Sequence, residues 1–232
     1  MRNTIKRRYK ERLSRVLPYN RRISYLVELP KLHDWVRVHA DGCPLLSDRF
    51  DLYRYVNETV IGARPISYLE FGVFEGASIR AWAQTNCEPA SDFVGFDTFE
   101  GVDEPWALLV NDVDMKTFDV NGTYPSIDDG RVRFVKGYFQ DTLPEFLQTF
   151  QPAHRLVVHC DADLYSSTLY TLSKCDSIMA PGTVVVFDEF SSIQHEFRAL
   201  ADYCAAYRRD YRTVAATKSE NSYFDQIAIE LR

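Results

Sequence analysis

The hydrophobic pattern of the chain changes near residue 62, after which short apolar runs alternate with amphipathic ones. Runs such as LVVHCD and VVVFD are apolar along their whole length, which is typical of strands buried on both faces. The runs between them have the helical period of 3.6 residues. We predict strands at residues 66–71, 93–97, 132–136, 156–161 and 184–188. We predict helices at residues 77–85, 142–150, 168–179 and 193–207.

This alternation predicts an α/β fold, in which right-handed crossovers join a mostly parallel sheet covered by helices. Residues 211–217 and 223–231 are two strand-like runs joined by a polar turn, and we expect them to form an antiparallel hairpin at the sheet edge. Residues 100–130 form a long irregular stretch of the kind that usually covers a binding site. The residues of this stretch that we expect over the pocket are Trp106, Asp112, Asp114 and Tyr124.

Residues 1–61 have a helical pattern with breaks near Pro18, Pro30 and the turn at 42–44. The segment 45–61 places apolar residues on one face of a further helix. We therefore expect two parts, a helical extension over residues 1–61 and an α/β domain over residues 62–232.

Charge is distributed unevenly along the 232 residues, whose formal net charge is -6. Residues 1–22 contain nine Lys or Arg and one acid, so the rest of the chain is strongly acidic. A body of this charge argues against general nucleic-acid binding, which needs clustered cations. The basic segment is interpreted as a solvated helix face, with a membrane surface, an acidic partner or the body itself as other options. The N-terminal helices are also a candidate surface for a homo-oligomer.

The cellular location is suggested by two features that the sequence lacks. No apolar run approaches the roughly 20 residues that cross a bilayer, and no continuous apolar stretch follows the basic N-terminus. The five cysteines are widely spaced and contain no C-x-x-C pair, which favours reduced thiols over disulfides or a zinc site. We expect a cytoplasmic protein with no transmembrane segment.

A glycine-containing turn follows the first strand of the α/β part, in the run EFGVFEGAS. Gly72 and Gly76 permit close approach of backbone and ligand, and Glu70 tolerates a cationic ligand such as a sulfonium compound with an amino group. Phe74 and Ser78 belong to the same candidate binding turn. The spacing differs from the G-x-G-x-x-G of nicotinamide-binding domains. A tight strand-to-helix turn without a ligand is the alternative interpretation.

The next two strand ends carry further candidates for nucleotide binding. Asp97 ends the second strand, where a carboxylate accepts the hydroxyls of a ribose, although it also suits a turn or helix cap. Thr98 and Phe99 follow it, and Phe99 is placed to flank an adenine. The third strand ends in residues that would frame the same ring, namely Gly137, Tyr138 and Phe139. We interpret Asp141 after them as a helix N-cap.

Four acidic residues follow the fourth and fifth strands, in HCDADLYSST and VVVFDEF. If these strands are neighbours, Asp161, Asp163, Asp188 and Glu189 converge on one crevice at the carboxyl edge of the sheet. Several ionised carboxylates packed together repel one another, so either some are protonated or a cation lies between them. Oxygen ligands favour Mg²⁺ first, with Mn²⁺ or Ca²⁺ as alternatives. Helix capping by single acids is the non-functional interpretation.

Two histidines lie near this cluster in the sequence. His159 belongs to the buried fourth strand, and we interpret it as a packed core residue. His195 follows Asp188 on the first turns of the next helix and is a candidate catalytic base.

Taken in order, EFGVFEGAS, GFDTFEG, DADLYSST and PGTVVVFDEF resemble the macrocin-type (TylF/MycF-like) sugar O-methyltransferases over residues 66–200. The resemblance implies a class I methyltransferase (Rossmann-like) domain over residues 62–232 that uses S-adenosylmethionine and Mg²⁺ to methylate a sugar hydroxyl. It implies metal ligation by Asp161, Asp188 and Glu189, with Asp163 as general base. It also implies that Glu70, Gly72 and Asp97 hold the donor.

The chain departs from this family at two places. The family usually has an aromatic–Arg–Gly–Gly run where this chain has Phe74, Glu75, Gly76 and Ala77. The family usually has Asp–Asp after the fifth strand, where Glu189 is one methylene longer. The resulting hypothesis is a metal-dependent O-methyltransferase acting on a sugar, a glycosylated small molecule or a glycan. The alternatives are a non-catalytic methyltransferase-like scaffold and, less favoured by the glycine spacing, a nicotinamide-dependent oxidoreductase.

Overall fold

The computed structural model describes residues 12, 21–101, 106–107, 112–113, 116–220 and 222–232. Its α-helices are α2 (Arg21–Trp35), α3 (Arg49–Tyr55), α4 (Ala77–Thr85), α5 (Phe139–Thr149), α6 (Tyr165–Cys175) and α7 (Arg198–Tyr207). Its shorter helical segments are η1 (Val36–Ala40), η2 (Val56–Ile61), η3 (Asp176–Ile178) and η4 (Ile193–Phe197). Its strands are β1 (Leu45–Leu46), β2 (Ile66–Phe71), β3 (Asp92–Asp97), β4 (Trp106–Ala107), β5 (Asp112–Val113), β6 (Val132–Lys136), β7 (Arg155–Cys160), β8 (Val184–Phe187), β9 (Tyr211–Thr217) and β10 (Ile227–Leu231).

The main sheet has the strand order β1-β9-β10-β8-β7-β2-β3-β6, and β4 pairs separately with β5. From β8 to β6 the neighbouring strands are parallel, whereas β10 is antiparallel to both β8 and β9. The predicted α/β sheet with an antiparallel C-terminal hairpin is therefore confirmed. Phe71 aligns with Cys160, and Cys160 aligns with Phe187, so the carboxyl ends of β2, β7 and β8 lie level.

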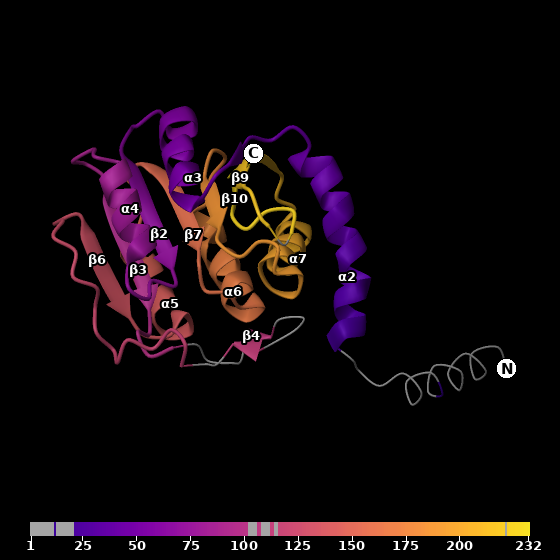
Figure 1. Ribbon diagram of the computed structural model, residues 1–232. Helices are drawn as coiled ribbons and strands as arrows, with labels where there is room; N and C mark the ends of the chain where they lie inside the picture. The colour runs from indigo at the N-terminus through magenta and orange to yellow at the C-terminus, as the bar shows by residue number, and fades with distance from the viewer. Residues whose placement is uncertain (1–11, 13–20, 102–105, 108–111, 114–115, 221) are drawn as a thin grey trace.

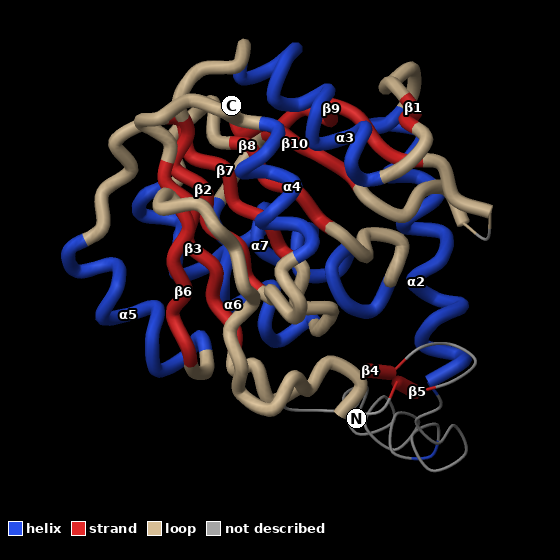
Figure 2. The backbone as a smooth tube through the Cα atoms, turned by 60° about the vertical axis from the view of Figure 1, so that its left-hand side comes forward, coloured by secondary structure: helices blue, strands red, loops and turns tan. Residues whose placement is uncertain are grey.

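Helices cover both faces of this sheet, which forms the middle of three layers (Figures 1 and 2). Side chains from α3, η2 and α4 pack with Phe93 on one face, whereas those from α2, α5, α6 and α7 pack with Val94 and Phe96 on the other. Because alternate side chains of a strand enter different cores, both sets must be apolar. This explains why the central strands are hydrophobic along their whole length.

The segment before β2 is part of the same core. Trp35 of α2 packs against Phe190 and Phe224, and its indole N–H donates to the Tyr211 hydroxyl at 2.6 Å. The predicted helix over 45–61 begins only at Arg49, because Asp48 is extended and its carboxylate caps the first turn. The preceding residues instead form β1, which pairs in parallel with β9. The basic residues of positions 1–11 and 13–20 lie outside the described residues.

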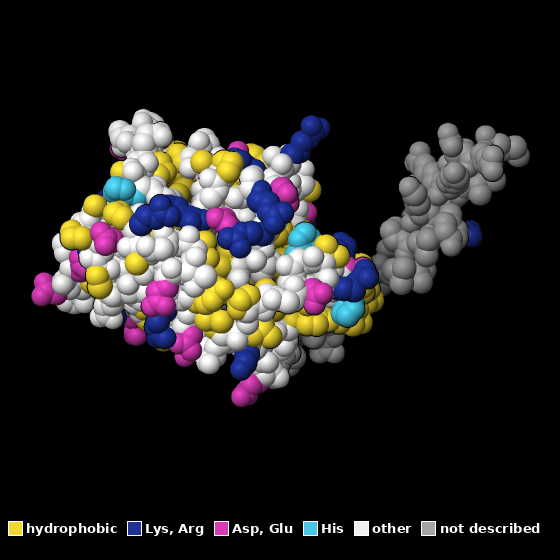
Figure 3. Space-filling model, turned by 90° about the horizontal axis from the view of Figure 1, so that it is seen from above, with side chains coloured by type: hydrophobic (Ala, Val, Ile, Leu, Met, Phe, Trp, Pro, Cys, Tyr) yellow, Lys and Arg dark blue, Asp and Glu magenta, His cyan; other side chains and the backbone are white. Residues whose placement is uncertain are grey.

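The amino ends of the parallel strands form the upper end of the molecule in Figure 1. Figure 3, which views this end, shows Lys and Arg side chains gathered near its middle with acidic side chains among them. At this end of the sheet, Glu230 pairs with both Arg155 and Arg212. Among the described helices, none combines the length and apolar character required to cross a bilayer.

Candidate active site

A cavity of about 420 Å³ opens at the carboxyl ends of β2, β3, β7 and β8, a volume typical of small-molecule sites. Its walls come from the turns after these strands, from the start of α3 and from the loop that contains Gly101 and Phe118. The residues of its lining that the sequence singled out are Gly72, Phe74, Ser78, Asp97, Thr98, Tyr138, Phe139, Asp161, Asp163, Asp188 and Glu189. The structure therefore brings most of the predicted site residues to one cavity.

Gly72 allows the first turn to pass very close to the end of β7. Its φ of 95° is unfavourable for residues with a side chain, and a Cβ there would lie 1.9 Å from the Asp161 carbonyl oxygen. Gly76 packs beneath Pro125, which a Cβ would approach to 2.8 Å. The two glycines therefore serve chain packing, and Gly72 in particular determines where Asp161 stands.

Asp97 holds the same turn from the end of β3. One carboxylate oxygen accepts the N–H groups of Val73 and Phe74 at 2.6 and 2.8 Å, and the other accepts that of Phe99 at 2.7 Å. A carboxylate has about four acceptor positions, so capacity remains on the side that faces the cavity. Asp97 thus fills the turn-forming role that the sequence left as an alternative, and it also borders the cavity.

Five residues singled out by the sequence lie outside the cavity lining. Glu70 is fully buried and accepts a short hydrogen bond from the Tyr68 hydroxyl. Phe99 packs in the core against Tyr124 and Phe134. The remaining three are Gly76, Gly137 and His195. The Gly137 N–H donates to the backbone carbonyl of Asp97. The His195 Nδ1 accepts the Tyr165 N–H at 3.3 Å.

The irregular stretch 100–130 contributes to the cavity through Gly101 and Phe118, and the Phe118 ring packs edge-on against Phe74. Tyr124 is exposed and stacks on Phe134. Asp114 lies outside the described residues, as do the side chains of Trp106 and Asp112.

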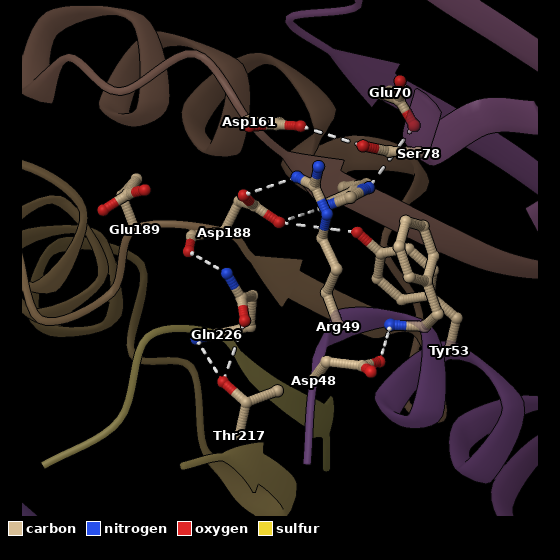
Figure 4. A network of polar contacts seen from close by, with 12 residues as sticks. Asp48, Arg49, Tyr53, Glu70, Ser78, Asp161, Asp188, Glu189, Thr217 and Gln226 are labelled. Atoms are coloured by element: carbon tan, nitrogen blue, oxygen red, sulfur yellow. Dashed lines mark hydrogen bonds and ion pairs between the residues drawn. The ribbon is translucent and has the colours of Figure 1, made fainter. Parts of the chain in front are cut away.

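The acidic cluster lies on the adjacent ends of β7 and β8, as predicted. Asp161 accepts a hydrogen bond from Ser78 at 3.2 Å, which connects the start of α4 to the cluster (Figure 4). Asp188 is nearly buried, and its two oxygens face different groups. One oxygen lies 3.3 Å from the Arg49 guanidinium, and the other lies 3.4 Å from the Tyr53 hydroxyl.

His159 lies fully buried beside Asp188 and Glu70. Its Nδ1 lies 2.7 Å from the Tyr68 hydroxyl and 3.4 Å from Glu70, while its Nε2 lies 3.7 Å from Asp188. Burial alone would lower the pKa of His159, but the contacts with Asp188 and Glu70 outweigh burial and raise it to about 10. His159 is buried, as expected of a core residue. It also contacts Glu70 and Asp188 and is therefore part of the acidic cluster.

The acids differ in their protonation. Burial raises the pKa of Asp188, but His159 and Arg49 outweigh burial, so the net shift is downward. Burial and the charge of Asp188 raise the pKa of Asp161 well above its ordinary value. Burial, followed by the charges of Glu189 and Asp188, does the same for Asp163, whose backbone has a φ of 59°. Burial and Asp188 raise the pKa of Glu189 to about 7.

A divalent cation fits the donors of this cluster. Ligand atoms of His159, Asp161 and Asp188 all lie within 4.8 Å of one another, and His159 Nε2 is buried without a hydrogen-bond partner. Glu189 lies on the cavity wall, outside this group of three, and Figure 4 shows it pointing away from Asp161. The two carboxylate oxygens suit Mg²⁺ and Mn²⁺, and His159 would add a nitrogen ligand only in its neutral form.

Sequence reasoning missed four residues of the cluster, namely Arg49, Tyr53, His159 as a charged group, and Glu196. Glu196 is fully buried and accepts the Glu189 N–H at 2.9 Å, which fixes the backbone beside the cavity. His159 carried one signal, because it precedes Asp161 by two positions on a strand and so shares its face. Arg49 carried none, because 139 residues separate it from Asp188.

Solved structures of similar shape identify the fold. The O-methyltransferase NovP matches with a TM-score of 0.57 at 22% identity over 78% of each chain. The calicheamicin methyltransferase CalS11 matches with a TM-score of 0.56 at 23% identity over 78% of this chain and 77% of that chain. An O-methyltransferase from Bacillus cereus, solved in complex with SAH, matches 96% of each chain with a TM-score of 0.53 at 14% identity. The sheet order and the cavity at its carboxyl edge are those of the class I methyltransferase fold.

Sequence comparison narrows this class to a family. The model of the macrocin O-methyltransferase (TylF) family matches residues 47–217. This chain belongs to that family, as its motifs predicted. A curated protein of Streptomyces olivaceus, 8-demethyl-8-(2,3-dimethoxy-alpha-L-rhamnosyl)-tetracenomycin-C 4'-O-methyltransferase, is 31% identical over 184 residues. The match covers 71% of this chain and 65% of that relative, so the chain spans just under two thirds of the relative's length.

Proposed function

We propose that this protein transfers a methyl group from S-adenosylmethionine to a hydroxyl of a sugar or glycosylated small molecule, with the help of a divalent cation, Mg²⁺ first. The observation that carries the proposal is that Asp161, Asp163 and Asp188 border the same cavity as the Gly72 turn and Asp97. Family membership supports the reaction, and the name of the Streptomyces relative, which methylates a rhamnosyl group, supports a sugar acceptor.

The donor fits the part of the cavity between the first two turns. Apolar walls from Val73, Phe74 and Phe139 suit the base and the carbon chain, while Asp97 offers its remaining acceptor capacity to the ribose hydroxyls. Asp161 and Ser78 stand where the amino-acid end of the donor would lie. When bound, the donor supplies an electrophilic methyl group on a sulfonium.

Asp161 and Asp188 would hold the cation, together with Glu189, or with His159 in its neutral form, as the third ligand. When bound, the cation lowers the pKa of the acceptor hydroxyl and orients it. Asp163 is placed to accept the hydroxyl proton, because it borders the cavity and burial raises its pKa, which makes its carboxylate a stronger base. The acceptor oxygen forms a bond to the methyl carbon, the carbon–sulfur bond breaks, and the electron pair remains on a neutral thioether.

Asp163 is a better candidate base than His195 in this arrangement. The His195 Nδ1 accepts a backbone N–H from Tyr165 at 3.3 Å, and the cavity lining described here does not include it. Asp163 lines the cavity beside Asp188 and Glu189. We therefore propose Asp163 as the base.

Single substitutions test this assignment. We expect Asp161→Asn or Asp188→Asn to reduce divalent-dependent turnover by at least about 100-fold, since each removes a charge from the cation site. We expect Asp163→Asn to reduce turnover about 100-fold through loss of the base. Turnover is measured by mass spectrometry of rhamnosylated and nucleotide-linked sugar acceptors, and donor binding by calorimetry.

Asp34→Asn is the matched control, because Asp34 is exposed on α2 and pairs only loosely with Arg37. This variant should retain full turnover. If Asp161→Asn and Asp188→Asn both keep the activity of the parent protein, the metal assignment is wrong. If S-adenosylmethionine does not bind the parent protein at all, the proposed reaction is wrong.

A further inference from the structure

Arg49 places a positive charge inside the cavity, directly on one carboxylate of the acidic cluster. Its Nη1 lies 3.3 Å from Asp188, and Figure 4 shows the Arg49 side chain reaching toward this carboxylate. The Arg49 side chain is 34% exposed, whereas that of Asp188 is 6% exposed. In the part of the chain that the structure describes, Asp188 is the carboxylate with which Arg49 forms an ion pair.

We propose that Arg49 is a built-in counter-ion that a divalent cation must displace from Asp188 in order to bind. The inference rests on the proposed function, because it takes a divalent cation as part of the site. The Arg49 guanidinium and the His159 ring both lie against the Asp188 carboxylate. The cation site is thereby kept assembled before the cation arrives.

Of these two groups, Arg49 is the one whose side chain can move away from Asp188. His159 is completely buried, and its Nδ1 is fixed between Tyr68 and Glu70. Moving it away from Asp188 would leave charges unpaired in the interior, which is costly. Arg49 reaches the cluster from the open side, and its long side chain returns to water at little cost. A cation that takes Asp188 as a ligand therefore competes with Arg49 for this carboxylate.

The backbone of Arg49 is well placed for a reversible movement of its side chain. Asp48 caps α3 through the N–H groups of Phe50 and Asp51, both at 2.9 Å, so the first turn stays in place. The Phe50 ring lies 5.4 Å from the guanidinium carbon and offers an apolar surface beside it. Only side-chain torsions need to change when Arg49 leaves Asp188.

Displacement has a measurable consequence for cation affinity. The cation must break the Arg49–Asp188 pair before it binds, so removal of Arg49 should tighten binding. A charge-assisted hydrogen bond is commonly worth enough to change a binding constant by about tenfold or more. We therefore expect Arg49→Ala to lower the Kd for Mn²⁺ about tenfold, with Arg49→Gln showing the same direction while it preserves most of the side-chain volume.

Calorimetric titration of MnCl₂ and MgCl₂ into the full chain tests this expectation without any measurement of turnover. Arg54→Ala is the matched control, because Arg54 lies on the same helix, is exposed and pairs with Asp51. It should leave the Kd within about twofold of the parent value, since its charge is screened by solvent. Circular dichroism verifies that each variant is folded.

A second readout separates displacement from simple repulsion between Arg49 and the cation. Phenylglyoxal modifies accessible guanidinium groups, and peptide mass spectrometry reports the modification of Arg49. If the cation displaces Arg49, saturating Mn²⁺ should increase the rate of Arg49 modification several-fold, while Arg54 reacts at an unchanged rate. Tighter Mn²⁺ binding by Arg49→Ala without this increase would mean repulsion alone and would overturn the proposal.

The other possible results of the titrations also test the role of Arg49. Unchanged or weaker Mn²⁺ binding in both Arg49 variants overturns the proposal, as does the absence of cation binding in parent and variants alike. Titration of S-adenosylhomocysteine in the same samples distinguishes these results from a failure of the proposed function. If the nucleoside binds while the Arg49 variants bind Mn²⁺ like the parent, only the role of Arg49 is wrong. If it does not bind, the proposed methyl transfer is wrong.

Discussion

Gly72 and Asp161 show how a single residue controls the geometry of the acidic cluster. The turn after β2 passes so close to the end of β7 that the Asp161 carbonyl oxygen occupies the space of a Gly72 side chain. The position of the Asp161 carboxylate therefore depends on the absence of a Cβ at Gly72, at the end of the neighbouring strand β2. A ligand-binding role for this glycine follows indirectly, through the carboxylate that it allows into the cavity.

We expect Gly72→Ala to destabilise the protein by at least about 3 kcal/mol, because it combines a steric clash with an unfavourable φ. Denaturant unfolding followed by circular dichroism measures the change. Gly182→Ala is the control, since Gly182 has a similar φ of 93° and open space where its Cβ would lie. This variant should lower the free energy of unfolding by only about 1–2 kcal/mol, because alanine is unfavourable at a positive φ. Equal losses for the two variants would show that the clash with Asp161 is unimportant.

Some residues of the site were predictable, and others were not, for physical reasons. Asp161 and Asp188 end buried strands, and parallel strands bring their carboxyl ends to one edge, so their meeting follows from the pattern. Arg49 reaches Asp188 from a separate helix, and no periodicity links the two positions. His159 was interpreted as a core residue because it lies within an apolar run. The hydrophobic pattern of that run does not show that the ring contacts Asp188 and Glu70.

At the scale of elements, the strands were easier to predict than the helix starts. β2, β6 and β9 have the predicted bounds, because an apolar run between polar turns marks both ends of a buried strand. α5 begins at Phe139, three residues before the predicted start, so Asp141 lies in its first turn and is not its N-cap. The positive φ of Gly137 turns the chain directly from β6 into this helix. β1 was missed because two residues are too few for a period.

One arginine joins three elements on the far side of β3. Arg131 precedes β6 and donates to the carbonyl groups of Ala83, Asn86 and Glu88 and to the carboxylate of Asp129. It thereby satisfies the last carbonyl groups of α4 and fixes the loop that follows. No signal in the sequence distinguished it from the other arginines.

We expect Arg131→Ala to lower the free energy of unfolding at pH 7 by about 2–4 kcal/mol, since several acceptors lose a charged donor. The hydrogen bond from Arg131 lowers the pKa of Asp129, so this stabilisation is present above the unfolded pKa of about 4 and is lost as pH falls below it. The difference in free energy of unfolding between parent and variant should therefore decrease as the pH falls below about 4. Arg133→Ala, on the exposed side of β6, should cost less than about 1 kcal/mol. A difference that is constant from pH 7 to pH 3 would contradict the role of Asp129.

At the scale of the whole molecule, burial separates the cysteines into reactive and protected groups. All five are free thiols, as the sequence predicted. Burial raises the pKa of Cys175 to about 12 and that of Cys160 well above its ordinary range, whereas Cys87 is exposed.

We expect iodoacetamide at pH 8 to label Cys87 at least about tenfold faster than Cys160 or Cys175, because only accessible thiolates react. Peptide mass spectrometry of the native protein measures the three rates, and the same reaction in denaturant is the control, in which the rates should become similar. Fast labelling of Cys175 in the native protein would show that the layer of α6 opens readily.

The overall fold could be predicted from the sequence, because it depends on many residues that repeat one pattern. The acceptor could not be predicted in this way. The cavity wall combines the turns after the strands, the start of α3, Gly101 and Phe118, and its shape depends on their packing. We propose that residues 62–232 bind the donor and that the preceding segment completes the pocket through Arg49. The choice of acceptor would depend on the shape of this wall and not on any single motif.

The most direct test of the account is a crystal structure with S-adenosylhomocysteine and Mn²⁺, using the anomalous signal of the metal. We expect the nucleoside beside the Gly72 turn and a single anomalous peak within about 2.5 Å of carboxylate oxygens from both Asp161 and Asp188. Density for the nucleoside elsewhere, or a Mn²⁺ peak that touches neither carboxylate, would contradict the claim that these acids and the methyl donor share one site.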